Sequence, residues 1–214
     1  MKKLLCIFLA MCVWTGLSSC SPENEPENDS STEVPETPGT PDSGDLETSE
    51  PNPTVGKSLI VYFSWSGHTR AVANIIRELT GSDMVEIEVE EPYSEVYNEV
   101  TARARQELDN DIRPALRRRV ENMDEYDTLI VGTPIWSSRL APPVKSFLAG
   151  YDLSGKKIAP FCTHGGSGTA QSVNNIREVC PDSELLQPLA VYGSRAADSR
   201  SDVEQWLRTA GIIE

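Results

Sequence analysis

Residues 58–70 read Ser-Leu-Ile-Val-Tyr-Phe-Ser-Trp-Ser-Gly-His-Thr-Arg, an apolar run that passes directly into a loop of hydroxyl and glycine residues. The run is too short and too rich in β-branched residues for a buried helix, so it predicts a strand. Beyond the loop, Val72, Ile75, Ile76 and Leu79 recur at helical spacing. The stretch therefore predicts a strand, a tight loop and an amphipathic helix.

The loop between this strand and helix has the composition of a phosphate-binding site. A helix N-terminus presents unpaired N–H groups and the positive end of the helix dipole. The side chains of Ser64, Ser66 and Thr69 add donors, Gly67 lets the backbone approach a ligand closely, and Arg70 adds positive charge. The chain has neither G-x-x-x-x-G-K-[ST] nor G-x-G-x-x-G. A terminal monophosphate therefore fits the loop better than a triphosphate or a dinucleotide.

Two later strands also end in loops suited to a ligand. Residues 128–136 read Thr-Leu-Ile-Val-Gly-Thr-Pro-Ile-Trp, and a third strand from Lys157 leads into Thr-His-Gly-Gly-Ser-Gly at 163–168. The carboxyl ends of parallel strands meet at one edge of a sheet, where ligands bind. A planar ring needs an aromatic face and backbone hydrogen bonds at its polar rim, which these two loops can supply together.

The loop at 64–69 resembles the flavodoxin phosphate loop, a [Thr/Ser]-x-[Thr/Ser]-Gly-x-Thr pattern that binds the phosphate of FMN. The resemblance extends over residues 57–214 and implies FMN as the cofactor, with no catalytic acid or base indicated. It places the phosphate at the first loop, and the ring between the second and third loops with Trp136 stacked against it. The implied cofactor-binding residues are Ser64, Ser66, Gly67, His68, Thr69, Pro134, Ile135, Trp136, Thr163, His164, Gly165 and Gly166. His68 stands where flavodoxins commonly have asparagine.

Strands and helices alternate over the rest of the chain. The pattern predicts an edge strand at 83–90, helices within 93–107, at 144–148 and at 169–179, a strand near 185–191, and a final helix with a capping box at Ser201 and Glu204. Five strands alternating with helices predict one doubly wound α/β domain with a parallel sheet of order 2-1-3-4-5, which is the flavodoxin-like fold.

The first 19 residues have a charged start, an apolar stretch and small residues before Cys20, as a signal peptide does. The stretch is shorter than the roughly 20 residues of a spanning helix. Leu-Ser-Ser-Cys at 17–20 resembles a bacterial lipobox, which implies a lipid anchor on Cys20 and a place in the cell envelope, at the outer membrane. The acidic start at 21–25 is similar to the export signal of surface lipoproteins from Bacteroidetes. A simple secretory peptide cleaved nearby is the alternative.

Residues 20–56 are rich in Pro, Glu, Asp, Ser and Thr and almost free of large apolar side chains, so we expect a disordered tether before a domain at 57–214. The formal charge of the chain is −14, and the tether carries ten acidic residues and no basic ones. The remaining domain has 23 acidic and 17 basic residues. This balance argues against nucleic-acid binding, which requires a basic face.

Two cysteines, Cys162 and Cys180, fall in the domain. Cys162 should end a strand and Cys180 the helix that follows it, which places them about 15 Å apart by helix rise. That separation exceeds the ~7 Å Cα limit of a disulfide. We therefore expect two reduced, mostly buried thiols.

Three functions remain open at this point. The first is a membrane-tethered, FMN-binding electron carrier whose redox partners the sequence does not name. The second is an FMN-dependent NAD(P)H:quinone reductase on the same scaffold. The third is a binding module that keeps the fold without the flavin, against which Trp136 and the intact hydroxyl loop argue.

Overall fold

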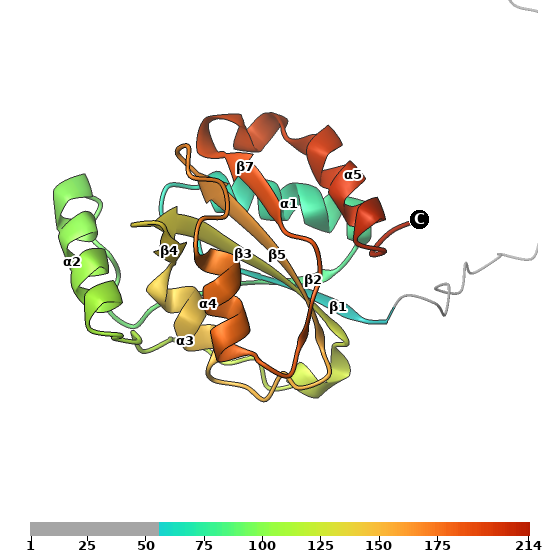
Figure 1. The fold of residues 1–214 in the computed structure, drawn as a ribbon, viewed down its shortest axis with the longest axis horizontal. Coiled ribbons are helices and arrows are strands. Elements are labelled where there is room, and N and C mark those ends of the chain that lie inside the picture. The colour runs from blue at the N-terminus through green and yellow to red at the C-terminus, as the bar shows by residue number, and fades with distance from the viewer. Residues whose placement is uncertain (1–55) are drawn as a thin grey trace, which may run out of the picture. The chain divides into compact units, whose positions relative to one another are not determined.

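The computed structural model describes residues 56–214, so the expected signal peptide, Cys20 and nearly all of the tether lie outside the described residues. Strands and helices alternate along the described chain (Figure 1). The strands are β1 Ser58–Tyr62, β2 Asp83–Glu86, β3 Thr128–Trp136, β4 Arg139–Leu140, β5 Lys157–His164, β6 Glu184–Leu185 and β7 Leu189–Tyr192. The α-helices are α1 His68–Thr80, α2 Tyr97–Asp109, α3 Pro142–Leu148, α4 Ser172–Val179 and α5 Arg200–Thr209, and two 3-10 helices are η1 Met123–Glu125 and η2 Gly193–Asp198.

The sheet has the order β2-β1-β3-β5, and β6 and β7 share the place beside β5. All these neighbours are parallel, which confirms the predicted order 2-1-3-4-5 with its fifth strand in two pieces. Pro188 lies between the pieces and has no N–H to donate, so the ladder is interrupted there. A short antiparallel strand, β4, folds back on the end of β3.

Helices cover both faces of the sheet, with α1 and α5 on one side and α3 and α4 on the other (Figure 1). Side chains alternate along β1, so Leu59 and Val61 join the core under α3 and α4 while Ile60 and Tyr62 join the core under α1 and α5. Each core is closed by apolar residues of its own helices. They include Val144, Phe147, Leu148 and Ile176 in the first, and Val72, Ile76, Val203, Trp206 and Leu207 in the second.

Gly132 and Phe161 are register partners on the two central strands, β3 and β5. A Cβ built on Gly132 would lie 2.2 Å from the tip of the Phe161 ring, and Phe161 is completely buried. The aromatic ring therefore occupies the space that a side chain at 132 would need. Glycine is required at this position by packing rather than by its backbone angles.

The helix α2 stands apart from these layers, beyond the β4 end of the sheet (Figure 1). Its buried residues Val100 and Ala104 belong to neither of the two main cores. They face a groove beside the ends of β1 and β3 instead. The sequence predicted a helix in this region but not its position.

Two predicted element boundaries are wrong. The edge strand stops at Glu86 rather than residue 90, because β1 ends at Tyr62, the register partner of Glu86, and offers no further parallel partner. Val89 forms only an isolated antiparallel bridge with Leu116. The helix expected from residue 169 begins at Ser172.

The predicted capping box is also wrong. Helix α5 begins at Arg200 after Ser199, so Ser201 lies inside the helix and does not cap it. The Glu204 carboxylate instead accepts a hydrogen bond from Arg208, one turn along the helix. Helix α1 ends at Gly81, which has a φ of 67° and caps the helix as glycine commonly does.

The two cysteines of the domain are free and buried, as expected. Burial raises the pKa of Cys162 to about 12 and that of Cys180 to about 11. Both thiols therefore stay protonated near neutral pH and are poor nucleophiles. Within residues 56–214, no helix has the length and apolar character needed to cross a membrane.

We expect Gly132→Ala to lower the free energy of unfolding by about 1–3 kcal/mol, because the added methyl must displace the buried Phe161 ring. Gly165→Ala is the matched control, since a Cβ there meets nothing within 4 Å. Urea denaturation followed by circular dichroism measures both variants. Equal stability of the two variants would contradict the packing argument.

Candidate functional site

The first loop leads into α1 through Gly67, whose φ of 87° lies in the left-handed region that favours glycine. As the N-cap residue, Gly67 has no side chain that could accept the first N–H groups of the helix. The Arg70 N–H donates to the hydroxyl of Ser64 at 3.3 Å, while Ser66 and His68 are exposed. The N–H groups at the start of a helix have no partners within the helix. The arrangement thus keeps donors and two exposed side chains at the positive end of α1.

Thr69 and Thr163 join the first loop to the third. Their hydroxyl oxygens lie 2.9 Å apart in a hydrogen bond, with only 1% of Thr69 and 5% of Thr163 exposed. Two candidate ligand-binding residues, 94 positions apart in sequence, are therefore in contact. In this arrangement their hydroxyls hold the two loops together.

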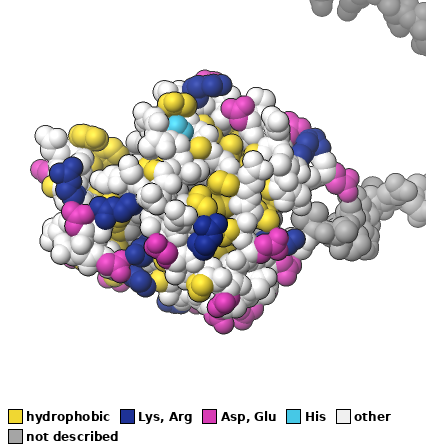
Figure 2. Space-filling view, in the orientation of Figure 1, with side chains coloured by type: hydrophobic (Ala, Val, Ile, Leu, Met, Phe, Trp, Pro, Cys, Tyr) yellow, Lys and Arg dark blue, Asp and Glu magenta, His cyan; other side chains and the backbone are white. Residues whose placement is uncertain are grey.

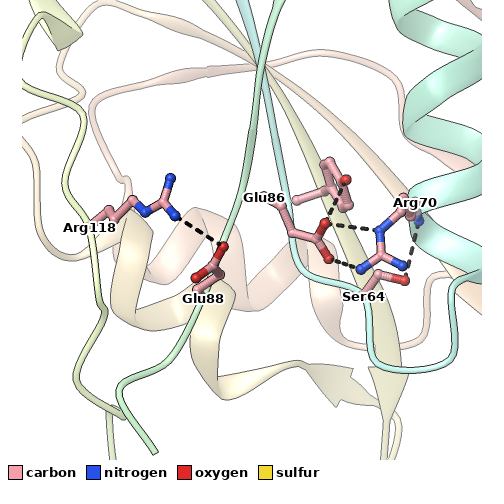
Figure 3. A network of polar contacts seen from close by, with 6 residues as sticks. Ser64, Arg70, Glu86, Glu88 and Arg118 are labelled. Carbon is pink, nitrogen blue, oxygen red and sulfur yellow. Dashed lines mark hydrogen bonds and ion pairs between the residues drawn. The ribbon is translucent and has the colours of Figure 1, made fainter. Parts of the chain in front are cut away.

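Arg70 follows the phosphate-type loop, but its guanidinium is turned to β2 (Figure 3). It binds both carboxylate oxygens of Glu86, at 2.9 and 2.5 Å. The Tyr62 hydroxyl donates to the same carboxylate at 3.0 Å, and burial together with Glu86 raises the pKa of Tyr62 to about 12. The positive charge of Arg70 is balanced locally, so backbone N–H groups remain the main attraction for an anion at the loop.

The second loop is a tight hairpin at the end of β3. Ser137 and Ser138 connect Trp136 to Arg139, and both serines have positive φ, at 46° and 61°. Two-residue hairpins with positive φ at both positions match the twist of the strands but favour glycine or asparagine. The half-buried Trp136 ring meets Phe63 nearly at right angles, with 5.4 Å between ring centroids. The hairpin therefore places Trp136 beside the end of β1.

The third loop holds His164 in a defined orientation. His164 is 8% exposed, its Nδ1 accepts the Gly166 N–H at 2.9 Å, and its ring lies 4.5 Å from that of Tyr192. Gly165 and Gly166 are exposed. The side chains at 163 and 164 thus support the loop from inside, while the two glycines leave backbone open at its surface.

Sequence reasoning missed a group of aromatic residues beside Trp136. Tyr93 meets Trp136 edge-on, at 5.0 Å between centroids, and its hydroxyl donates to the buried carboxylate of Glu107 at 2.5 Å. Arg103 pairs with Glu107 at 2.8 Å and lies over the Tyr93 ring. Burial and then Glu107 raise the pKa of Tyr93. The signal available in the sequence was the pair of tyrosines at 93 and 97 in an otherwise polar stretch.

A groove of about 310 Å³ opens between α2 and the ends of β1 and β3. Trp65 and Trp136 line it from the sheet side, and Tyr97 and Arg105 line it from α2. The predicted residues Ile135 and Trp136 of the second loop therefore meet helix α2 here, together with Trp65 of the first loop, which was not among the predicted site residues. The third loop contributes no lining residue to this groove.

The sequence model of the flavodoxin family matches residues 57–210, which is nearly all of the described domain. The chain belongs to the flavodoxin family. The strand order and the three loops at the carboxyl ends of β1, β3 and β5 agree with this family assignment.

Solved structures resemble this flavodoxin-family domain over nearly their whole length. A protein from Bacteroides eggerthii, whose crystal structure has been solved, shares 26% sequence identity with this chain. The two structures match with a TM-score of 0.65 over 74% of this chain and 99% of that chain. The crystal structure of a flavoprotein in complex with FMN, from Lactobacillus acidophilus, is 25% identical, with a TM-score of 0.58 over 71% of this chain and 99% of that chain.

Two curated relatives are each named NAD(P)H dehydrogenase (quinone). The protein from Afipia carboxidovorans is 31% identical over 114 residues, which are 53% of this chain and 54% of the relative. The protein from Caulobacter vibrioides is 29% identical over 111 residues, which are 52% of this chain and 53% of the relative. The flavodoxin-family chain thus spans about half the length of these relatives.

We expect the hydroxyl pair between the first and third loops to stabilise the domain measurably. Thr69→Val and Thr163→Val should each lower the free energy of unfolding by about 1 kcal/mol, because each removes one partner of a buried hydrogen bond. The double variant should lose less stability than the sum of the two single losses, which corresponds to a coupling energy of about 0.5–1 kcal/mol in a double-mutant cycle. Strict additivity in chemical denaturation would contradict the contact.

Proposed function

We propose that this chain binds FMN at the carboxyl ends of β1, β3 and β5. The observation that carries the proposal is the start of α1, where the N-cap residue Gly67 has no side chain to occupy the first N–H groups and two neighbours, Ser66 and His68, are exposed. Such a helix terminus attracts a phosphate through its N–H groups and dipole. Ser64 lies in the loop and offers its hydroxyl proton, whereas the hydroxyl of Thr69, in the first turn of α1, is bonded to Thr163.

The other two loops suit the ring of the same cofactor. Pro134, Ile135 and Trp136 are half-buried at the end of β3, which leaves an aromatic surface near the loop. Gly165 and Gly166 expose backbone groups that can hydrogen bond a polar ring edge. When bound, FMN supplies one- and two-electron redox chemistry, while the protein binds and orients it. The solved flavoprotein complex from Lactobacillus acidophilus supports the same cofactor.

Electron transfer between redox partners is the role that we propose for the loaded protein. Membership of the flavodoxin family supports this role. Because one fold hosts many activities, the function is argued from the residues of the site. The second candidate is NAD(P)H-dependent quinone reduction. It is supported by the names of the two curated relatives, which match about half of their length.

The phosphate-binding role of the first loop predicts a selective effect of Ser66→Ala. Ser66 is exposed, so the change should leave folding intact but remove a donor to a charged group. We expect FMN affinity to fall about tenfold, as loss of a charge-assisted hydrogen bond does. Riboflavin, which has the same ring without phosphate, is the control and should bind both proteins equally. Fluorescence titration measures both ligands, and failure of the unmodified chain to retain FMN would leave the flavin-free binding module.

The two redox roles differ in their response to nicotinamide. For a carrier, we expect the FMN-loaded protein to oxidise NADPH no faster than the same concentration of free FMN, with or without a soluble quinone. The measurement is the loss of NADPH absorbance under anaerobic conditions. A rate that saturates with NADPH and depends on the quinone would instead establish the reductase.

We propose further that Cys20 carries a lipid that anchors the chain to a membrane of the cell envelope, with outer-membrane and surface display as the expected location. The support is the sequence at 17–20 and the acidic residues that follow it. We expect the chain to enter the detergent phase on detergent partitioning and Cys20→Ser to remain in the aqueous phase. Cys162→Ser is the control, because that thiol is buried within the domain.

A further inference from the structure

The groove beside α2 overlaps only in part with the proposed FMN-binding residues. Its lining includes none of the phosphate-loop hydroxyls and no residue of the 163–166 loop. It shares only Ile135 and Trp136 with that set. Its volume of about 310 Å³ falls at the lower end of the roughly 300–1,000 Å³ found for small-molecule sites. The groove is therefore large enough for a ligand of its own.

Hydrogen bonds and ring contacts hold the aromatic walls of this groove. The Trp65 Nε1–H donates to the Ser94 carbonyl at 2.9 Å, which fixes its ring beside α2. Trp136 is held by the edge-on contacts of Phe63 and Tyr93. Because the Tyr93 hydroxyl is anchored on Glu107, a residue of α2, the helix and the Trp136 wall are connected. Two indole rings thus line a preformed space.

The helix side of the groove exposes apolar surface to water. Tyr97 is 69% exposed and its neighbour Val96 is 54% exposed, although both are large hydrophobic residues. Hydrophobic side chains gather over α2 in the space-filling view, next to Lys and Arg side chains (Figure 2). Exposed apolar surface at the rim of a hollow marks a ligand or interaction site. A planar ring would cover this surface and contact the indoles.

Arg105 gives the groove a positive charge that has no partner. Within residues 56–214, no carboxylate lies within ion-pair distance of Arg105. Its neighbour Arg103 is paired with Glu107, and Arg139, across from the same helix, is paired with Asp109. A guanidinium left unpaired beside two tryptophans is suited to an anionic ligand.

We propose that this groove binds a planar aromatic anion, with the rings packed against Trp65, Trp136 and Tyr97 and the anionic group near Arg105. Aromatic packing favours a flat, polycyclic ligand over an aliphatic one. The guanidinium favours an anion over a neutral or cationic ring. The site does not depend on bound FMN, but it shares Trp136 with the proposed flavin-binding residues. Its ligand is thus placed to be a small-molecule redox partner of the protein.

The test uses the full chain and anthraquinone-2-sulfonate, with isothermal titration calorimetry and quenching of tryptophan fluorescence as readouts. We expect the sulfonate to bind, neutral 2-(hydroxymethyl)anthraquinone to bind about fivefold more weakly, and cyclohexanesulfonate not to bind. Arg105→Gln should remove the preference for the sulfonate and leave the neutral ring unaffected, because a surface charge contact contributes up to about fivefold. The preference should also vanish near 1 M salt, where the screening length is about 3 Å.

Two further variants separate this site from nonspecific binding. Arg177→Gln on α4 is the matched control, since Arg177 is also a helical arginine without an ion pair in the described domain and does not line the groove. It should bind both anthraquinones as the unmodified chain does. Tyr97→Ser should weaken both anthraquinones about fivefold, in keeping with the contribution of aromatic packing. Identical affinities for all three variants and the unmodified chain would overturn the proposal.

Titration in the presence of saturating FMN distinguishes this site from the cofactor site. Unchanged affinity for the sulfonate supports a separate groove. Competitive displacement of the sulfonate by FMN would overturn the proposal and assign the groove to the flavin ring. If the chain retains no FMN, the proposed cofactor role fails. The present inference is then tested on the flavin-free chain alone, by whether the sulfonate binds and whether its binding depends on Arg105.

Discussion

The close approach of the Phe161 ring to the backbone of Gly132 is the constraint on which the site geometry depends. It joins the two central strands at a position where a larger residue on β3 would collide with a fully buried ring. Two residues further along, Pro134 of β3 and Thr163 of β5 are register partners, so the ends of these two strands lie side by side and the second and third loops follow from the same edge of the sheet. Thr163 then reaches Thr69 of the first loop. Packing inside the sheet thereby sets where the loops meet.

Electrostatics at the first loop are divided between side chains and backbone. Arg70 is the cation closest in sequence to the loop, yet Glu86 holds it through both oxygens on the edge strand (Figure 3). An anion at the loop would therefore be attracted chiefly by the N–H groups at the start of α1. Arg105 differs, because no carboxylate of the described domain neutralises it. The domain thus presents two positive features of different origin, the start of α1 and the side chain of Arg105.

The fold could be predicted from the sequence because its signals are local. The β-branched run at 58–63, the helical spacing after it and the repeated alternation define a doubly wound sheet, and Gly81 marks the end of α1. The early end of β2 escaped prediction because it depends on where its neighbour β1 ends. The break at Pro188 is a local signal that the expected strand at 185–191 did not take into account. Ser201 failed as a cap because the helix starts at Arg200, just before it.

The candidate site was predictable only in part. The three loops follow from strand ends, but the position of α2 follows from contacts far apart in sequence. Tyr93, for example, is fixed by Glu107 and by Trp136, neither of which a local pattern connects with it. The same holds for the hydroxyl pair of Thr69 and Thr163. Side-chain partners of this kind arise from tertiary packing, which residue spacing does not encode.

The short outer strands have a consequence for solubility. One edge of the sheet is β2, with four residues that include Asp83 and Glu86, and the other is divided between β6 and β7, of two and four residues. Unpaired edge strands invite pairing with other chains, and short length and charge are the usual protection. Neither margin of this sheet offers a long, uninterrupted ladder to a second molecule. The domain is therefore built to resist edge-to-edge aggregation at high local concentration.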